Sequence, residues 1–441
     1  MAKIHNPRKI IMKADKTLRK ITDFYLKSRD FNGILITDLG KDFEAIRKRL
    51  KKLVEEGKVV LNFGDRHPNP HILAFEPESK EQQLTKLETL QFQQPIYEEY
   101  GPLRIQTNSI GCCAYPSKNH LKSLVNSDHY KGKPFTLLLA QGEPQLSYRT
   151  FDLRVLEFYR NDPRYDYETD DVYGRMSSKS ERELKQQDDT FLQTFGFAYD
   201  RDVKNRYVAV FLRYLSDLTP EHQQRWKLEE FAGDTFLHPD YARTACGQWP
   251  EKESIFNAFC EETRIINEMT LKITGKPLLR KTYDRRNKPK KFGFLVRPTK
   301  EEYENFIRLL DKMMSDNLNK QFFEGRVDLT RLQRKGELYV EQNKGTISLL
   351  EEWLNKTTKF PDSKPKNEMI KVFKEIRDER SKPAHHVRED EWNSQYFVKQ
   401  RETIMRAYQA IRTLRLIFSN HPITKTVEVP DWLYKGEIWT Y

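Results

Sequence analysis

Apolar residues recur at helical spacing in two stretches close to the N-terminus. In residues 10–25 they lie on one side of a helix: Leu18, Ile21 and Tyr25. In residues 42–56 they occupy positions i, i+4, i+7 and i+8: Ile46, Leu50, Leu53 and Val54. Gly57 then ends the second helix as a C-terminal cap. The apolar runs 59–61 and 72–75 are expected to pair as strands around a turn-rich connection.

The second of these helices also carries a basic face opposite its apolar one. Its basic residues are Arg47, Lys48, Lys51 and Lys52. Helix, basic helix and hairpin follow one another in the order of a winged helix-turn-helix, which residues 8–76 resemble. The resemblance implies a helix that can enter the major groove of DNA, although domains of this kind also serve purely as contacts between proteins. Both interpretations stay open.

Beyond residue 76 the pattern changes several times between polar, strand-like and helical. Residues 77–95 are polar and indicate a helix or linker. Three strand-like runs precede a helix at about 220–231, namely residues 135–139, 153–158 and 207–215. The last run is expected to pair with residues 191–199 as a hairpin, and an amphipathic helix follows at 253–273. These elements predict a central mixed α/β domain.

From about residue 300 to nearly residue 420 the pattern is helical. Four amphipathic helices are expected, with apolar faces in residues 303–313, 347–354, 369–376 and 397–418. Short loops make an up-down bundle their simplest packing. The predicted fold class is therefore α+β with several domains: a winged-helix-like domain at 1–78, a linker helix at 79–95, a central α/β sensing or regulatory domain at 96–298, and an all-α domain at 299–441.

The composition excludes several classes of protein. Of 441 residues 37% are hydrophobic and 32% are charged, and no apolar run approaches the roughly 18 residues that a membrane-spanning helix needs. The basic N-terminus has no apolar segment behind it, so a secretory signal is not expected. Four cysteines, two of them adjacent at Cys112 and Cys113, form neither a disulfide framework nor a zinc pattern. We therefore expect a cytoplasmic protein without membrane attachment, metal or cofactor.

The net charge of +12 is concentrated in two segments. Residues 1–60 hold 16 Lys and Arg against 8 Asp and Glu, and residues 280–297 hold eight basic side chains against a single acid. Concentrated positive charge attracts polyphosphates by releasing their counterions, so both segments are candidate nucleic-acid surfaces. The alternative is a pair of solvated surfaces. In the second segment the candidates are Arg280, Lys281, Arg285, Arg286, Lys288, Lys290 and Lys291.

Aromatic residues are interleaved with the cations of the second basic segment. Tyr283, Phe292 and Phe294 suit stacking on unpaired bases, although residues 292–296 equally fit a buried strand. An acidic run at Asp166, Glu168, Asp170 and Asp171 has ligands for magnesium, but no second cluster completes a site and a solvated loop is the better interpretation. His120 and His129 are expected at the surface or in structural roles.

A short motif separates the last two predicted helices: Arg377-Asp378-Glu379-Arg380-Ser381-Lys382-Pro383-Ala384-His385-His386-Val387. An Arg, four residues and a His at this place resemble the motif of the HEPN superfamily, over residues 300–420. The same spacing occurs at Arg66 and His71, but within the expected wing, where no pair of helices supports it. Ser381 follows the Arg where the family often has Asn, Asp or His, and Pro383 breaks the helix before His385.

The HEPN resemblance implies a helical, usually dimeric domain and, in many members, a metal-independent ribonuclease. Arg380 is then expected to stabilise the charge that gathers on phosphorus. His385 is expected to move the proton, because an unperturbed histidine titrates near neutral pH. His386 competes with His385 for this role. Ser381 and Lys382 are expected to orient the phosphate, and Asp378 to hold an Arg in place.

The predicted function is a metal-independent endoribonuclease that cleaves RNA by attack of the 2′-hydroxyl, in bacterial defence or as a toxin. The expected partners are RNA, further copies of the chain in a homodimer or higher oligomer, DNA if the N-terminal domain binds it, and a regulatory or antitoxin protein. The alternative is a non-catalytic winged-helix DNA-binding regulator whose helical domain only dimerises. Only the nuclease depends on His385.

Overall fold

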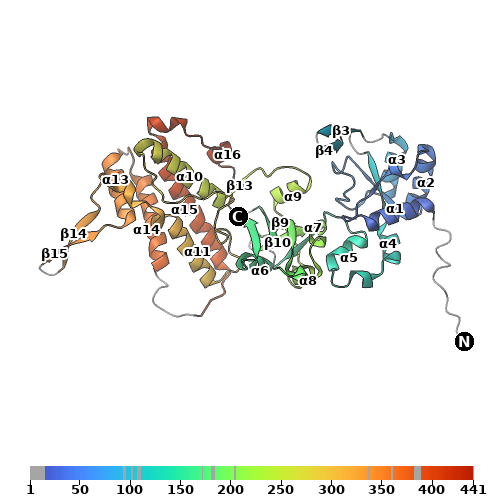
Figure 1. Cartoon of the computed structure of the whole chain (residues 1–441), viewed down its shortest axis with the longest axis horizontal. Coiled ribbons are helices and arrows are strands. Elements are labelled where there is room, and N and C mark those ends of the chain that lie inside the picture. Colours follow the sequence, from blue (N-terminus) through green and yellow to red (C-terminus); the bar gives the residue numbers. More distant parts are fainter. Residues whose placement is uncertain are drawn as a thin grey trace. The chain divides into compact units, whose positions relative to one another are not determined.

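The computed structural model describes residues 15–92, 96–100, 103–106, 111–170, 172–179, 184–202, 205–335, 338–358, 361–381 and 389–440. They form two compact units (Figure 1): unit 1 comprises residues up to 155 together with 176–249, and unit 2 comprises residues 156–175 together with those from 250 onward. Helices and mostly antiparallel sheets confirm the mixed α+β class. None of the described helices combines the length and apolar character that a membrane crossing requires.

The first two helices of unit 1 form where the apolar periodicity predicts them. Helix α1 (Lys16–Lys27) begins at Asp15 and helix α2 (Phe43–Glu55) begins at Asp42. Each aspartate accepts a hydrogen bond from a backbone N–H of the first turn, which satisfies a donor that the helix itself leaves unpaired. Gly57, with φ +66°, ends α2 as expected. The predicted apolar faces of both helices are buried.

A three-stranded antiparallel sheet packs with these helices in the order β1-β5-β2. Its strands are β1 (Ile34–Leu35), β2 (Val59–Phe63) and β5 (Cys112–Pro116). The expected pairing of residues 59–61 with 72–75 is wrong, because β5 lies in the centre, with Ala114 opposite both Ile34 and Leu61. Residues 72–75 form no strand. Instead, the side-chain amide of Asn62 donates to the carbonyls of Pro70 and Ile72, both at 2.9 Å.

The segment between β2 and β5 is an insertion rather than a linker. It contains helix α3 (Lys80–Thr89) and a hairpin of β3 (Tyr97–Tyr100) and β4 (Leu103–Gln106). Helix α3 packs against α2 and buries Leu87 in the same core. Because β5 and α3 complete this sheet and core, the expected boundaries at 78 and 95 divide one structure.

The second sheet has the order β11-β6-β10-β9-β8-β7, with β12 beside β9. Its strands are β6 (Tyr148–Phe151), β7 (Tyr165–Thr169), β8 (Tyr173–Ser178), β9 (Phe191–Tyr199), β10 (Arg206–Phe211), β11 (Glu230–Phe231) and β12 (Phe236–Leu237). The helices between residues 118 and 245 are α4 (Lys118–Leu124), α5 (Pro134–Ala140), α6 (Val155–Asn161), α7 (Leu212–Ser216), α8 (Pro220–Leu228) and α9 (Pro239–Ala245).

Expectations for this region are confirmed for one hairpin and wrong for two strands. The expected pairing of 191–199 with 207–215 is present in part as β9 and β10, with Tyr207 opposite Ala198, but residues 212–215 belong to helix α7. The runs 135–139 and 153–158 lie largely in helices α5 and α6 instead. An apolar run of five or six residues fits a buried strand and a short buried helix equally well, so periodicity does not separate them. Pro134, at the first turn of α5, favours the helix.

Unit 2 is built around helices that share one apolar core. They are α10 (Ile255–Thr274), α11 (Lys300–Met313), α12 (Lys320–Phe323), α13 (Thr346–Thr357), α14 (Lys364–Ser381), α15 (Gln395–Ser419) and α16 (Asp431–Lys435). The four predicted C-terminal helices are present as α11, α13, α14 and α15. Helix α10 packs along α15 and belongs to the same core, so this core extends across the expected boundary at 298.

Unit 2 also contains two small sheets. Strands β13 (Glu253–Ser254) and β16 (Ile438–Trp439) pair in parallel. Strands β14 (Thr330–Lys335) and β15 (Leu338–Asn343) form an antiparallel hairpin within the region that was expected to be helical throughout. Figure 1 shows this hairpin projecting beyond the helices of unit 2. All six side chains of β15 are exposed, so burial periodicity carries little information about this strand.

A buried ion pair joins the two helices that pack most extensively in unit 2. Nε of Arg415 on α15 donates to Oε2 of Glu262 on α10, and the two side chains are 5% and 0% exposed. Burial raises the pKa of Glu262, and the nearby charge of Arg415 opposes this rise. A carboxylate in this position depends on its partner, because an unpaired buried charge is costly.

We expect Arg415→Met to lower the free energy of unfolding by about 3–5 kcal/mol at neutral pH, since it leaves Glu262 charged and unpaired. The pKa of Glu262 then rises further above its unfolded value, so the loss shrinks as pH falls toward about 4.3, the ordinary value for a glutamate. Urea titrations at several pH values measure this. The double variant Glu262→Leu with Arg415→Met is the control and should lose much less stability. A loss independent of pH would contradict the role of the pair.

Candidate nucleic-acid site at the end of helix α14

Helix α14 ends in two arginines that bind the same two aspartates. Arg377 and Arg380 are three positions apart, so their side chains leave the same face of the helix. Nε of Arg377 donates to Asp311 at 3.2 Å, and its Nη2 donates to Asp316 at 2.7 Å. Nη1 of Arg380 donates to Oδ2 of Asp311 at 2.5 Å and also to Oδ2 of Asp316. We call these four residues the α14 ion cluster.

Asp311 is the buried centre of the α14 ion cluster. Its side chain is 0% exposed, whereas the side chains of Arg377 and Arg380 are 31% and 32% exposed. It follows Ile307 by four positions on the buried face of α11, where an acid requires charged partners. The hydrogen bond to Asp311 raises the pKa of Arg380 above its ordinary value. The guanidinium therefore stays charged at every physiological pH.

Arg380 keeps part of its guanidinium outside the cluster. Within the described residues its hydrogen bonds are all made by Nη1, so Nε and Nη2 have no partner there. Ser381, the last residue of α14, donates from Oγ to the carbonyl of Arg377 at 3.0 Å. This bond occupies the hydroxyl that was expected to orient a phosphate. The helix end thus offers two arginine donors that its own described contacts do not use.

A second contact holds the end of α14 from the direction of α11 and α15. The hydroxyl of Tyr303 donates to Oε1 of Glu379 at 3.0 Å and lies 3.3 Å from Oγ1 of Thr403. Burial raises the pKa of Tyr303 well above its ordinary value, so the phenol remains a proton donor. With the ion cluster, this contact fixes the last turn of α14 against two other helices.

Of the predicted catalytic pair, only Arg380 lies among the described residues. His385, together with the supporting residues Lys382 and His386, lies outside the described residues. Asp378, which was expected to hold an Arg in place, is exposed and forms no ion pair among the described residues. Asp311 and Asp316 take this role. A sequence signal for Asp311 existed, namely an acid on the apolar face of the predicted 303–313 helix.

Helix α3 covers part of the basic face of α2. Arg47 donates to the last carbonyls of α3 and the residue after it, those of Leu87, Glu88 and Leu90. Its guanidinium also lies over the ring of Phe92, with 5.0 Å to the centroid. A cation at a helix C-terminus satisfies carbonyls that the helix leaves unpaired. Arg47 therefore has a structural contact in place of the expected contact with nucleic acid.

The remaining basic residues of α2 differ in their exposure. Lys51 forms an ion pair with Glu88 of α3 at 2.7 Å. Lys52 is 73% exposed and lies 3.8 Å from Glu56. Lys48 is exposed and has no partner among the described residues. Two of the four predicted binding residues are thus left open to a partner.

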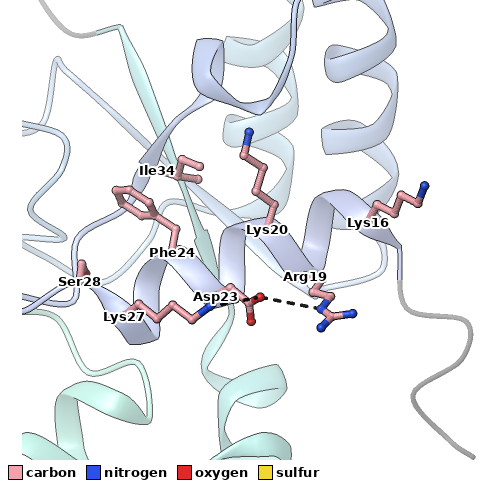
Figure 2. A pocket seen from close by; sticks show the side chains of 8 residues that line it. All are labelled: Lys16, Arg19, Lys20, Asp23, Phe24, Lys27, Ser28 and Ile34. Carbon is pink, nitrogen blue, oxygen red and sulfur yellow. Dashed lines mark ion pairs between the residues drawn. The ribbon is translucent and has the colours of Figure 1, made fainter.

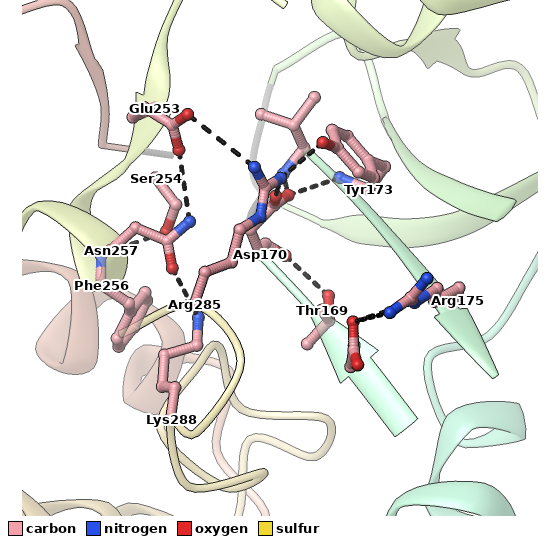
Figure 3. A network of polar contacts seen from close by, with 12 residues as sticks. Thr169, Asp170, Tyr173, Arg175, Glu253, Ser254, Phe256, Asn257, Arg285 and Lys288 are labelled. Carbon is pink, nitrogen blue, oxygen red and sulfur yellow. Dashed lines mark hydrogen bonds and ion pairs between the residues drawn. The ribbon is translucent and has the colours of Figure 1, made fainter. Parts of the chain in front are cut away.

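The second basic segment is partly neutralised within unit 2. Figure 3 shows Arg285 donating to Asp170 and to the hydroxyl of Tyr173, with Glu253 at 4.0 Å. Asp170 is buried, and its Oδ1 accepts from the backbone N–H of Tyr173 at 2.8 Å. The acidic run that was weighed as a magnesium site therefore supplies a partner for an arginine. Its neighbour Glu168 pairs with Arg175 at 2.8 Å, and Asp171 lies outside the described residues.

Other members of this segment are bound as well. Lys288 donates to Oδ1 of Asn257 at 3.1 Å, and Lys290 donates to the carbonyl of Tyr165 at 2.6 Å. Phe292 is buried against Phe256, with 5.1 Å between ring centroids, so it packs in the core and does not present a stacking surface. Four predicted binding residues stay exposed: Arg280, Lys281, Arg286 and Lys291.

The cysteine and histidine candidates have structural contacts. Sγ of Cys113 lies 3.4 Å from Nδ1 of His71, which resembles a thiol–imidazole pair. However, Nδ1 of His71 also bonds the carbonyl of Gly33 at 2.7 Å, and burial raises the pKa of Cys113 well above its ordinary value. The thiol is therefore not activated. His120 is half-buried beside Thr22, and His129 is exposed. Within the described ranges no group of three or more His, Cys, Asp or Glu side chains is arranged to hold a metal.

We expect Arg47→Ala to lower the free energy of unfolding by about 1–2 kcal/mol, because the carbonyls at the end of α3 lose a charged donor. Amide hydrogen exchange within residues 80–89 should also become faster. Lys48→Ala, at the adjacent exposed position, is the matched control and should change stability by less than about 0.5 kcal/mol. Equal losses of unfolding free energy in both variants would show that the contact of Arg47 with α3 does not stabilise the fold.

We expect Asp311→Ala to lower the free energy of unfolding by about 2–3 kcal/mol, less than the full cost of breaking a buried pair because the two arginines are partly exposed to water. Asp378→Ala removes an acid from the exposed face of α14 and should cost less than about 0.5 kcal/mol. Urea titration of the two variants decides between the observed and the expected partner of the arginines. A larger loss in Asp378→Ala would contradict the α14 ion cluster.

Comparison with known proteins identifies no relative of this chain. No family model, no curated protein and no solved structure matches the chain.

Proposed function

We propose that the chain is a metal-independent endoribonuclease of the HEPN type, in which Arg380 and His385 act on the phosphodiester bond of RNA. One observation carries the proposal. The guanidinium of Arg380 is anchored through Nη1 at the end of α14, five residues before His385, and its Nε and Nη2 make no hydrogen bond to the described residues. An arginine held in this way can direct two donors at a phosphate without rearranging during the reaction.

The proposed reaction uses only groups of the substrate and the chain. The 2′-hydroxyl of a ribose attacks the adjacent phosphorus, a new P–O2′ bond forms, and the P–O5′ bond breaks. His385 accepts the proton of the 2′-hydroxyl and then delivers a proton to the leaving 5′-oxygen, because an imidazole changes protonation near neutral pH. Arg380 stabilises the negative charge on the pentacoordinate phosphorus. The products are a 2′,3′-cyclic phosphate and a 5′-hydroxyl.

The charge balance of the α14 ion cluster shapes this proposal. Two arginines face two aspartates, so the cluster has no excess positive charge to attract RNA from a distance. Its contribution is directional. Asp311 and Asp316 hold the guanidinium of Arg380, and the remaining edge of that guanidinium binds the phosphate. Lysine has a single nitrogen and does not match the forked geometry of arginine. Long-range attraction of RNA then falls to the exposed cations elsewhere on the chain.

The proposed setting follows the HEPN resemblance. In this setting the chain acts as a bacterial defence effector or toxin. Two or more copies bring their motifs together, and a regulatory or antitoxin protein binds the chain. The alternative is a DNA-binding regulator that uses α2. Helix α3 covers Arg47 and Lys51, which weakens the case for this DNA-binding regulator. Lys48 and Lys52 stay exposed, so DNA binding by α2 can still be tested. We therefore prefer the nuclease.

Incubation of the purified protein with RNA in EDTA tests the proposal. We expect cleavage to continue in the chelator, to leave 2′,3′-cyclic phosphate ends, and to fall by about 10²-fold or more in His385→Ala and in Arg380→Ala. Arg380→Lys should be nearly as inactive, because one nitrogen does not serve the aspartates and the phosphate together.

Arg66→Ala is the matched control, since it removes an arginine with the same spacing to a histidine from a loop of unit 1. Arg66 bonds the carbonyl of Glu76 at 2.6 Å and is expected to leave cleavage unchanged. Full activity in both Arg380→Ala and His385→Ala would rule out the nuclease. Sequence-selective binding of duplex DNA that Lys48→Ala weakens, without cleavage of RNA, would favour the regulator.

A further inference from the structure

An open groove of about 640 Å³ follows the side of helix α1 that faces away from the core of unit 1. The residues that line it are Lys16, Arg19, Lys20, Asp23, Phe24, Lys27, Ser28 and Ile34. The first six occupy positions i, i+3, i+4, i+7, i+8 and i+11 of the helix, so they form one continuous stripe over about 16 Å. Figure 2 shows this stripe along α1.

The groove carries four cations and one acid. Asp23 lies between Arg19 and Lys27, at 3.8 and 3.9 Å, and Figure 2 shows both ion pairs. The side chains of Arg19 and Lys27 are 70% and 79% exposed, so solvent screens these contacts strongly. Lys20 donates to the carbonyl of Asp38, a neutral acceptor that leaves the ammonium charge uncompensated. A net positive charge therefore remains along the groove.

An aromatic ring lies among these cations. Phe24 is 39% exposed, whereas the apolar residues on the opposite face of α1, such as Ile21, are buried. Phe24 does not belong to the core cluster that contains Leu18 and Ile21. A phenyl ring that is partly open to solvent and bordered by cations offers a stacking surface for a base, while the cations offer sites for phosphates.

We propose that the α1 groove binds single-stranded nucleic acid, with its phosphates along Lys16, Arg19, Lys20 and Lys27 and a base stacked on Phe24. Charge complementarity identifies a polyanion, and the exposed ring favours one whose bases are unpaired, since bases within a duplex are already stacked on each other. The groove lies within the basic segment 1–60, but it contains none of the four α2 residues that were predicted to bind nucleic acid there. The proposal does not depend on the nuclease.

Fluorescence anisotropy of the full-length protein with labelled oligothymidylate tests the proposal. This probe lacks the 2′-hydroxyl, so a ribonuclease does not degrade it. Replacing Lys16, Arg19 and Lys27 by Ala should weaken binding by about tenfold or more at low salt and reduce the slope of log K against log salt by about 2, at roughly 0.7 per phosphate contact of a single strand. Phe24→Leu should weaken binding about fivefold, with little change of slope.

Two further variants separate the groove from general surface charge. Asp23→Asn removes the acid within the stripe and should tighten binding, which a purely structural role for α1 does not predict. The double variant Lys122→Ala with Lys131→Ala removes two exposed cations of unit 1 that do not line the groove and should bind like the wild type.

Several results would overturn the proposal. They are unchanged affinity in the triple variant while it remains folded, equal weakening in the Lys122 and Lys131 control, or competition by duplex DNA or polyglutamate that equals competition by unlabelled single strand. Duplex competition would identify a double-helical partner, and polyglutamate competition an acidic protein. Failure of the nuclease would appear separately, as uncleaved RNA in EDTA with oligothymidylate binding intact.

Discussion

A carboxylate that is buried away from water needs cationic side chains of the same protein beside it. Unit 2 is organised around this constraint. Asp311 on α11 takes two guanidiniums from α14, and Glu262 on α10 takes one from α15. Each pair fixes one helix against another, because moving the helices apart would leave a charge unpaired in the core. The direction of Arg380, and with it the proposed chemistry, depends on the first of these pairs.

The same requirement limits how arginine and lysine can serve nucleic acid. A guanidinium that is fully committed to acids or carbonyls is a structural group, and Arg47 is an example. A guanidinium anchored by one nitrogen has a defined position and still offers donors, which is the arrangement at Arg380. The cations of the α1 groove have weak partners and attract through charge. In these proposals, the anchored arginine at the end of α14 and the exposed cations that attract nucleic acid thus lie in different parts of the chain.

Local elements could be predicted because the residues that decide them are neighbours in sequence. The N-caps Asp15 and Asp42 and the apolar faces behind them define α1 and α2 within a few turns. The hairpin of β9 and β10 also forms between nearby segments. The candidate site was only partly predictable, because the partner of Arg380 is Asp311, which is distant in sequence and approaches it only when α11 and α14 pack together.

Spacing and composition were enough to predict the C-terminal helices, the two basic segments and the Arg380 motif, since both follow directly from the order of residues. Packing between distant segments places β5 in the first sheet, joins α10 to the C-terminal helices and leaves only some cations available. These features could not be predicted because burial and charge pairing are satisfied between segments far apart in the chain. Arg285 and Lys16 are both cations of the basic segments, yet a buried aspartate binds the first and the second is exposed.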